Sequence, residues 1–266
     1  MHVQHVHAAQ EAKMSAHGPH AGLLAALLLI VGLCAPVSAS AITFTMPSAG
    51  TIVLAVAYPG TPSQGNYIIY KRASDKRCFF HDIGSLEQDV IINGSSGRDS
   101  YFEYKQAANG SYPIFCGAAV ESVYPESPDL DNPYRFEINL KGGDDVAITY
   151  NTDMFHDMII RGGGGNDILR YDGPGHVNIF GTFFLGPELH GGDGDDYLYT
   201  GTVMYGDAGN DTLCASRPDE FTAEAIGGSG SDIFCGGRLD SHEDVEVIGL
   251  GDIFGCPAAC DGILGW

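Results

Sequence analysis

A nine-residue phrase rich in glycine and aspartate occurs four times in the C-terminal half of this 266-residue chain. The copies begin at Gly162, Gly191, Gly206 and Gly227. Each has Gly at positions one and four, Asp at position six and a large apolar residue at position eight. A phrase that recurs with constant internal spacing is typical of stacked structural repeats. Because glycine allows the positive φ of a sharp turn, we expect each copy to form a turn that leads into a short strand.

The distances between the copies suit stacked coils of chain. A shortened copy, which lacks two residues, opens the array at Gly142, so the starts at 142, 162, 191, 206 and 227 are 20, 29, 15 and 21 residues apart. About 20 residues is enough for one coil of a parallel solenoid with a glycine turn on one edge. We expect the 29-residue interval to carry an extra loop or a degenerate turn around residues 173–175. The 15-residue interval is short for a complete coil.

The phrase resembles the RTX nonapeptide, G-G-x-G-x-D-x-U-x, which builds a parallel β-roll around calcium ions. The family's tandem form repeats every nine residues, so this chain departs from its spacing. The resemblance implies that each ion lies between neighbouring turns, which supply backbone carbonyls and the position-six carboxylate. The implied carboxylate ligands are Asp167, Asp196, Asp211 and Asp232. The implied carbonyl ligands are Gly162, Gly164, Gly191, Asp193, Gly206, Ala208, Gly227 and Ser229.

The residues after each Asp are expected to enter a strand, with position eight pointing into an apolar core. These residues are Leu169, Leu198, Leu213 and Phe234. Asp207 departs from the pattern, because it stands at position two, where glycine is preferred. The alternative to a calcium site is a set of Gly-Asp turns in a repetitive β-protein without metal.

The acidic residues are concentrated in the repeat region. Residues 136–266 contain 23 Asp and Glu against 5 Lys and Arg, whereas residues 1–135 contain 11 against 8. Bound cations would relieve the self-repulsion of such a region, although an acidic surface that only confers solubility has the same composition. The charge argues against nucleic acid as a partner, because phosphates would be repelled.

The N-terminus has the features of a secretory leader. An apolar run from Leu23 to Leu33 is followed by small residues that offer cleavage sites near Ala41. The run is short for a spanning helix, so we expect a secreted protein without stable membrane insertion; a single membrane anchor is the alternative. Six cysteines follow the leader, an even number that suggests disulfides in an exported chain. We expect Cys78 to pair with Cys116, and Cys214, Cys235, Cys256 and Cys260 to pair among themselves; a zinc site is the alternative, although no C-x-x-C pair occurs.

The sequence predicts an all-β protein in three parts. Residues 1–41 form the leader, residues 42–135 a small β-sandwich-like domain, and residues 136–266 a calcium-binding β-roll with a cysteine-containing C-terminal cap. Short segments rich in β-branched and aromatic residues, separated by turn signals, predict the middle part. A stretch with three prolines, residues 125–133, is interpreted as the linker; its Asp-x-Asp spacing only faintly resembles a calcium loop.

No catalytic motif is evident in the sequence. Neither H-E-x-x-H nor G-x-S-x-G occurs, and the non-repeat region is small for a hydrolase. We therefore expect a non-catalytic, secreted calcium-binding protein. An adhesion module that recognises a glycan or another surface partner through residues 42–135 is the first alternative, and a small secreted hydrolase is the second.

Overall fold

The computed structural model describes residues 41–57, 65–125, 134–150, 156–171, 178–179, 182–183, 187–201, 203–215, 223–236, 239–243 and 247–250. The chain divides into two compact units, Met1–Ala39 and Ser40–Trp266, and the described residues all belong to the second. The predicted leader, the linker from residue 126 and the C-terminal cap from residue 251 therefore lie outside the described residues. Within the described part of the chain, no helix is long and apolar enough to cross a bilayer.

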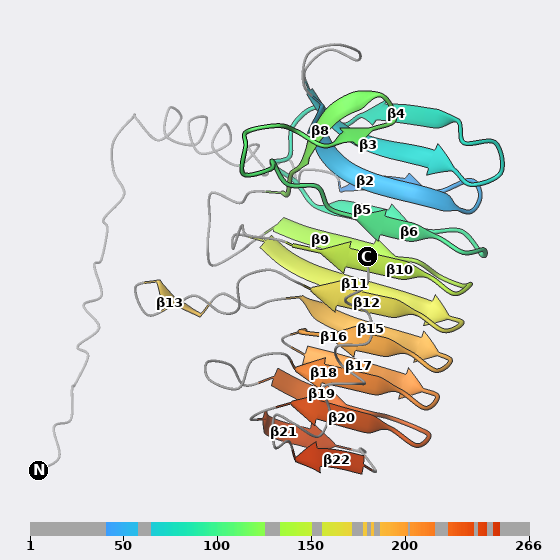
Figure 1. Cartoon of the computed structure of the whole chain (residues 1–266), viewed down its shortest axis with the longest axis vertical. Coiled ribbons are helices and arrows are strands. Elements are labelled where there is room, and N and C mark those ends of the chain that lie inside the picture. Colours follow the sequence, from blue (N-terminus) through green and yellow to red (C-terminus); the bar gives the residue numbers. More distant parts are fainter. Residues whose placement is uncertain are drawn as a thin grey trace, which may run out of the picture. The chain divides into compact units, whose positions relative to one another are not determined.

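Every regular element of the described residues is a β-strand, which confirms the all-β prediction (Figure 1). One sheet has eight strands, and all its neighbours pair in parallel. In order across the sheet they are β1 (Ile42–Thr45), β5 (Val90–Asn93), β9 (Tyr134–Asn139), β11 (His156–Gly164), β15 (Glu188–Asp193), β17 (Val203–Ala208), β19 (Ala223–Ile226) and β21 (Leu239–Glu243).

The second sheet has twelve strands and is also mostly parallel. Its parallel part runs through β22 (Val247–Leu250), β20 (Ile233–Gly236), β18 (Thr212–Ala215), β16 (Tyr197–Tyr199), β12 (Ile168–Tyr171), β10 (Val146–Thr149), β6 (Ser100–Phe102) and β2 (Gly50–Ala57). Its antiparallel strands are β3 (Gly65–Arg72), β4 (Cys78–Asp82), β7 (Ile114–Phe115) and β8 (Ala118–Ser122).

The chain alternates between the two sheets. We call a strand of the eight-stranded sheet, the turn after it and the next strand of the twelve-stranded sheet a rung; β9 with β10 and β11 with β12 are examples. Successive rungs stack in parallel register, and the turns within the rungs lie along one edge, at the right in Figure 1. Each glycine phrase forms the turn of one rung.

The core lies between the sheets and confirms the prediction for position eight. Leu169, Leu198, Leu213 and Phe234 are buried and are stacked directly on one another. The row continues toward the N-terminus through Ala147, Tyr101 and Ile52, and the facing sheet contributes residues such as Ile160 and Leu189 to the same cluster. Truncation of one such leucine to alanine typically costs about 2–5 kcal/mol.

The predicted small sandwich at residues 42–135 differs from the structure, because its strands continue the same two sheets. Strand β5 pairs with β9 over four residues, and β6 pairs with β10 over three. The boundary near residue 135 is thus a change of composition, and both sheets cross it. Beyond β2, the antiparallel strands β3, β4 and β8 enclose a second, smaller core that includes Val53, Ile69 and Phe115.

A disulfide between Cys78 and Cys116 ties β4 to the turn after β7, as predicted. For the later cysteines, β18 and β20 place Cys214 and Cys235 opposite one another in register. Cys256 and Cys260 lie outside the described residues, so the pairing of the four late cysteines stays a prediction.

The variable length of the rungs arises on the edge opposite the glycine turns. The 29-residue interval contains a hairpin of β13 (Asn178–Ile179) and β14 (Thr182–Phe183), while the predicted turn at residues 173–175 lies outside the described residues. The 15-residue interval is a complete rung, since β15 and β16 pair in register with β17 and β18. Thr200, at φ 61°, allows the short return between them.

Candidate functional site

The turns align residue by residue, and this alignment corrects the start of the array. Asn139 pairs with Arg161, and Gly142 forms a bridge with Gly164, so position one of the first array turn is Leu140. The copy predicted to be shortened is therefore complete. Its position two is Lys141, whose φ of 78° matches the left-handed conformation of the glycines at this position in other turns.

The alignment also reveals a copy that the sequence reading missed. The segment Gly94–Phe102 has Gly at positions one and four, Asp99 at position six and Tyr101 at position eight. It lies in register with the first array turn, since Asn93 pairs with Asn139, and Tyr101 with Ala147. The same spacing rule would have found it if an aromatic residue at position eight had been sought this far upstream.

The glycines at position four are required by the contact between neighbouring turns. From Gly143 onward all have positive φ, from 117° at Gly143 to 153° at Gly209, whereas Gly97 does not. A Cβ at Gly194, for example, would overlap the carbonyl group of Gly165 in the preceding turn. An L-residue would be strained in this conformation and would also push the rungs apart.

Glycine at position one leaves space for the aspartate of its turn, except in the first array turn, where Leu140 stands at this position. A Cβ on Gly191 would overlap Oδ2 of Asp196 in the same turn and would lie 2.8 Å from the carbonyl oxygen of Gly206 in the next turn. The turns at Gly162 and Gly206 repeat this arrangement with their own aspartate and the following carbonyl. Each missing side chain therefore leaves room for a carboxylate that faces a neighbouring carbonyl oxygen.

The position-six aspartates form a continuous row across the turns. Oδ1 of each aspartate accepts a hydrogen bond from the backbone N–H of the aspartate one rung earlier. The donor–acceptor distances along the row are 2.6 Å for Asp99 to Asp145, 2.8 Å for Asp145 to Asp167, 2.7 Å for Asp167 to Asp196, 2.8 Å for Asp196 to Asp211 and 2.8 Å for Asp211 to Asp232.

The second carboxylate oxygen, Oδ2, is buried in five of these aspartates and has no hydrogen-bond partner. The five are Asp145, Asp167, Asp196, Asp211 and Asp232. None of the five is more than 2% exposed. Because a buried acceptor without a partner is costly, and an ionised carboxylate more so, this row of oxygens requires a compensating group.

Burial raises the pKa of four carboxyl groups in this row. Burial raises the pKa of Asp196 to about 8. The hydrogen bond from Asp167 N–H opposes this increase, and the neighbouring carboxylates add to it. Burial likewise raises the pKa of Asp145 to about 7 and those of Asp167 and Asp211 to about 6. Without a cation, these four carboxyl groups therefore take up protons near neutral pH.

Asp99 is the exception in the row, because the protein itself satisfies both of its oxygens. Oδ1 accepts hydrogen bonds from Gly50 N–H at 3.0 Å and from the Ser95 hydroxyl at 3.2 Å, and Oδ2 accepts one from Ser95 N–H at 2.5 Å. Ser95 stands at position two without the left-handed φ found there in the array. This different backbone conformation turns the Ser95 N–H toward Oδ2.

The structure brings the twelve predicted site residues together along the glycine-turn edge. The position-six and position-one residues lie as described above. The position-three carbonyls each accept a backbone hydrogen bond from position four of the preceding turn; they belong to Gly164, Asp193, Ala208 and Ser229. Since a carbonyl has two lone pairs, these oxygens keep further acceptor capacity.

A second ladder, which the sequence reading missed, runs along the outside of the turns at position five. Oδ1 of Asp144 accepts from the backbone N–H of Asn166, and Oδ1 of Asn166 accepts from that of Asp195. The pattern continues through Asn210 to Ser231. These exposed side chains hold neighbouring turns together without occupying the buried row.

No cluster of three or more His, Cys, Asp or Glu side chains suited to a metal ion occurs among the residues that the structure describes. Each turn instead offers one buried carboxylate beside backbone carbonyls. Any ion here would thus be bound largely by main-chain oxygen, from two neighbouring turns.

The chain matches no protein-family model, no curated protein and no solved structure.

Proposed function

We propose that the chain is a secreted, non-catalytic calcium-binding protein, and that its rungs form a parallel β-solenoid of the β-roll type. The observation that carries the proposal is the row of five buried aspartate oxygens without partners. The resemblance of the turns to the RTX nonapeptide gives independent support.

The row fits a hard cation bound by oxygen. Calcium takes six to eight oxygen ligands from carboxylates, backbone carbonyls and water, and neighbouring rungs about 4.8 Å apart can supply them jointly. Magnesium holds its water shell in a stricter octahedron, and zinc prefers nitrogen and sulfur ligands, so both fit the row less well.

The residues that would hold the ions follow from the unsatisfied oxygens. Oδ2 of Asp145, Asp167, Asp196, Asp211 and Asp232 would supply the carboxylate ligands. The carbonyl oxygens at position one of the next turn, at Gly191, Gly206 and Gly227, border the same space beside the position-one glycines. The position-three carbonyls would supply further ligands through their second lone pair.

The proposed location outside the cell rests on two features. The N-terminal sequence has the pattern of a secretory leader, and the Cys78–Cys116 disulfide is typical of an oxidising compartment. Extracellular calcium modules commonly bind with Kd of about 10⁻⁴ to 10⁻³ M. Such affinities would couple the stability of the array to export.

Far-UV circular dichroism of the mature chain, with calcium and with a chelator, tests the proposal. We expect a strong β-spectrum in calcium and a weakened one after chelation, because ionised carboxylates in a bare row repel one another. Magnesium at the same concentration is the control and should not replace calcium. A spectrum that is identical in all three conditions would contradict the proposal.

A further inference from the structure

The tripeptide Asn-Gly-Ser occurs twice in the chain, at residues 93–95 and at residues 109–111. The first copy starts at the last residue of β5 and leads into the turn that contains Asp99, whereas the second copy lies in the loop between β6 and β7. Neither copy contains a proposed calcium ligand. Because the two copies have the same sequence, a difference in their chemistry must arise from the fold.

An Asn-Gly sequence is chemically labile wherever its backbone is free to move. The glycine nitrogen attacks Cγ of the asparagine side chain and forms an N–C bond, and the side-chain nitrogen leaves as ammonia with the proton of the glycine N–H. Water then opens the cyclic imide at one of its two carbonyl carbons, which gives aspartate or isoaspartate. Glycine favours the attack because it has no side chain to hinder its nitrogen.

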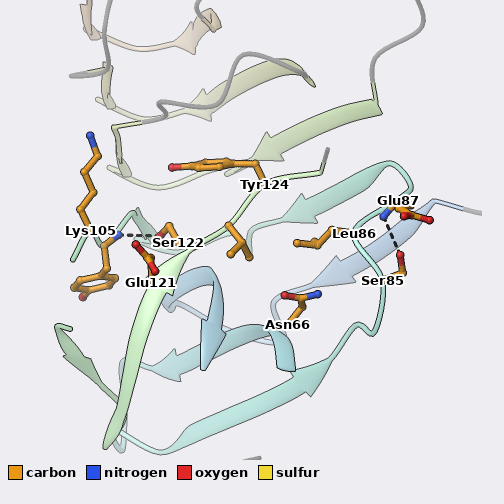
Figure 2. Close-up of a pocket in the computed structure, with 10 residues that line it drawn as sticks. Asn66, Ser85, Leu86, Glu87, Lys105, Glu121, Ser122 and Tyr124 are labelled. Carbon is orange, nitrogen blue, oxygen red and sulfur yellow. Dashed lines mark hydrogen bonds between the residues drawn. The ribbon is translucent and has the colours of Figure 1, made fainter. Parts of the chain in front are cut away.

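The loop that carries the second copy is fixed at its base and open at its tip. Tyr104 N–H donates to the Ser122 hydroxyl at 2.8 Å, which anchors the start of the loop next to Lys105 (Figure 2). All residues from Lys105 to Ser111 are exposed. Gly110 has a φ of 80°, and no atom outside its chain neighbours lies within 4 Å of the position that a Cβ would occupy there. The tip of the loop therefore has room for the cyclic imide.

Ser111 directs two hydrogen-bond donors to the side-chain carbonyl of Asn109. Its backbone nitrogen lies 3.0 Å and its hydroxyl oxygen 2.7 Å from Asn109 Oδ1. Two donors at this oxygen stabilise the negative charge that develops on it when the glycine nitrogen attacks Cγ. Gly110 N–H donates to the Ala107 carbonyl at 2.8 Å, but both residues are exposed, so water can replace this bond when the loop opens.

The first copy has the opposite environment. Gly94 is buried, and its N–H donates to the Asn139 carbonyl at 2.6 Å within the eight-stranded sheet. Ser95 gives its N–H and its hydroxyl to Asp99, so neither donor is directed to the Asn93 side chain. A Cβ at Gly94 would overlap a carbonyl group of the next turn. The packing around Gly94 thus leaves its backbone no room to form the imide.

We propose that Asn109 is a deamidation site that converts to aspartate and isoaspartate in the folded protein, and that the fold protects Asn93 from the same reaction. Ser111 is the positioning residue of this site, because its two donors act on the carbonyl under attack. The reaction adds a negative charge to an exposed loop, and isoaspartate also inserts the Cβ atom into the backbone. Water is the only co-reactant, so the site does not depend on the calcium proposal.

Peptide mapping by mass spectrometry, on the mature chain incubated at pH 8 in calcium, tests the site. We expect conversion at Asn109 to be at least about tenfold faster than at Asn93, because an exposed loop opens at a much lower cost in free energy than a sheet. In urea at the same pH the two rates should converge, since the tripeptides are identical. Ser111→Ala should slow conversion at Asn109 about threefold or more, and Ser111→Thr, which keeps the hydroxyl, should restore the rate.

The matched control is Ser95→Ala, the same change in the other tripeptide, because the Ser95 hydroxyl bonds to Asp99 and should not affect the rate at Asn109. The site is overturned if Asn109 stays intact in the folded protein but reacts in urea, or if Asn93 reacts as fast as Asn109 in calcium. A rate at Asn109 that is the same in Ser111→Ala as in the wild type would contradict the role of Ser111.

Discussion

Two parts of the aspartate row differ in how their carboxylates are satisfied. In the turn at residues 94–99, Ser95 donates to both oxygens of Asp99, and the turn is complete without any other group. In the array from Asp145 to Asp232, position two has a left-handed backbone, and Oδ2 is left without a partner. The same phrase therefore yields either a self-contained turn or an open ligand site, and the backbone at position two determines which.

Calcium removal should have the largest effect and should be confined to the array. Saturation of one site at one hundred times its Kd contributes about 2.7 kcal/mol, so several sites in a row dominate the stability of this region. We expect chelation to increase hydrogen exchange strongly at the turn amides around Asp167, Asp196 and Asp211. Peptides that cover Gly94–Asp99 should change least. Uniform loss of protection in both parts would contradict the distinction between a self-contained turn and an open ligand site.

Without calcium, stability should fall as pH rises. The folded-state pKa values, about 6 for Asp167 and Asp211, about 7 for Asp145 and about 8 for Asp196, lie above the unfolded value of about 3.9. The protonated carboxyl groups therefore contribute their full stabilisation of the folded state below about pH 4, and this contribution is lost as pH rises through 6 to 8.

Urea denaturation at pH 5 and pH 8, in chelator and in calcium, measures this effect. We expect the midpoint in chelator to be lower at pH 8 and the difference to shrink or reverse in calcium, because protons and calcium compete for the same oxygens. A midpoint in chelator that is higher at pH 8 would show that the row is not the titrating element.

Two glycine variants test whether the space that glycine leaves beside the aspartate at position one matters beyond the general cost of replacing a glycine. A methyl group on Gly191 would overlap Asp196 Oδ2, so Gly191→Ala should cost about 3 kcal/mol and weaken calcium binding. Gly142→Ala is the control, since its Cβ would meet only the Gly164 carbonyl at an ordinary 3.7 Å. Thermal denaturation should show a larger loss of stability for Gly191→Ala than for Gly142→Ala. Equal destabilisation would contradict a specific role for glycine at position one.

Asparagine substitutions should have opposite effects in the two parts when calcium is absent. In Asp99→Asn, one orientation of the amide sets its N–H₂ group against the Ser95 N–H, and the other leaves the donors to Oδ1 without an acceptor. Either orientation should destabilise the fold by about 1–3 kcal/mol. Asp196→Asn removes a buried charge and keeps the Oδ1 acceptor for Asp167 N–H, so in chelator at pH 8 it should be neutral or stabilising. Urea denaturation of both variants gives the signs, and destabilisation by Asp196→Asn as large as that by Asp99→Asn would contradict the distinction.

The sequence was sufficient to predict the parts of the fold that depend on local spacing. The four turns, the inward direction of Leu169 and its equivalents, and the Cys78–Cys116 pair all agree with the structure. Strand pairing across residue 135 was not predictable in this way. Asp99 and Asp145 are 46 residues apart, and nothing in the composition between them indicates that β5 continues the sheet of β9.

The details of the turns depend on backbone conformation, which residue types indicate only in part. Leu140 at position one and Lys141 at position two concealed the true start of the array, although Lys141 adopts the left-handed conformation expected of glycine. The closure of Asp99 by Ser95 was equally hidden, since a serine at position two is compatible with either backbone conformation. The position-five ladder was missed because its members, Asp, Asn and Ser, share only a short polar side chain.

Isothermal titration calorimetry measures whether the aspartate row binds calcium. The proteins to compare are the mature wild type, the Asp99→Asn variant and a triple variant with Asp167→Asn, Asp196→Asn and Asp211→Asn. We predict multi-site binding in the wild type and in Asp99→Asn, and loss of most of the sites in the triple variant. Absence of binding heat in the wild type, or undiminished stoichiometry in the triple variant, would show that the buried aspartate oxygens do not bind calcium.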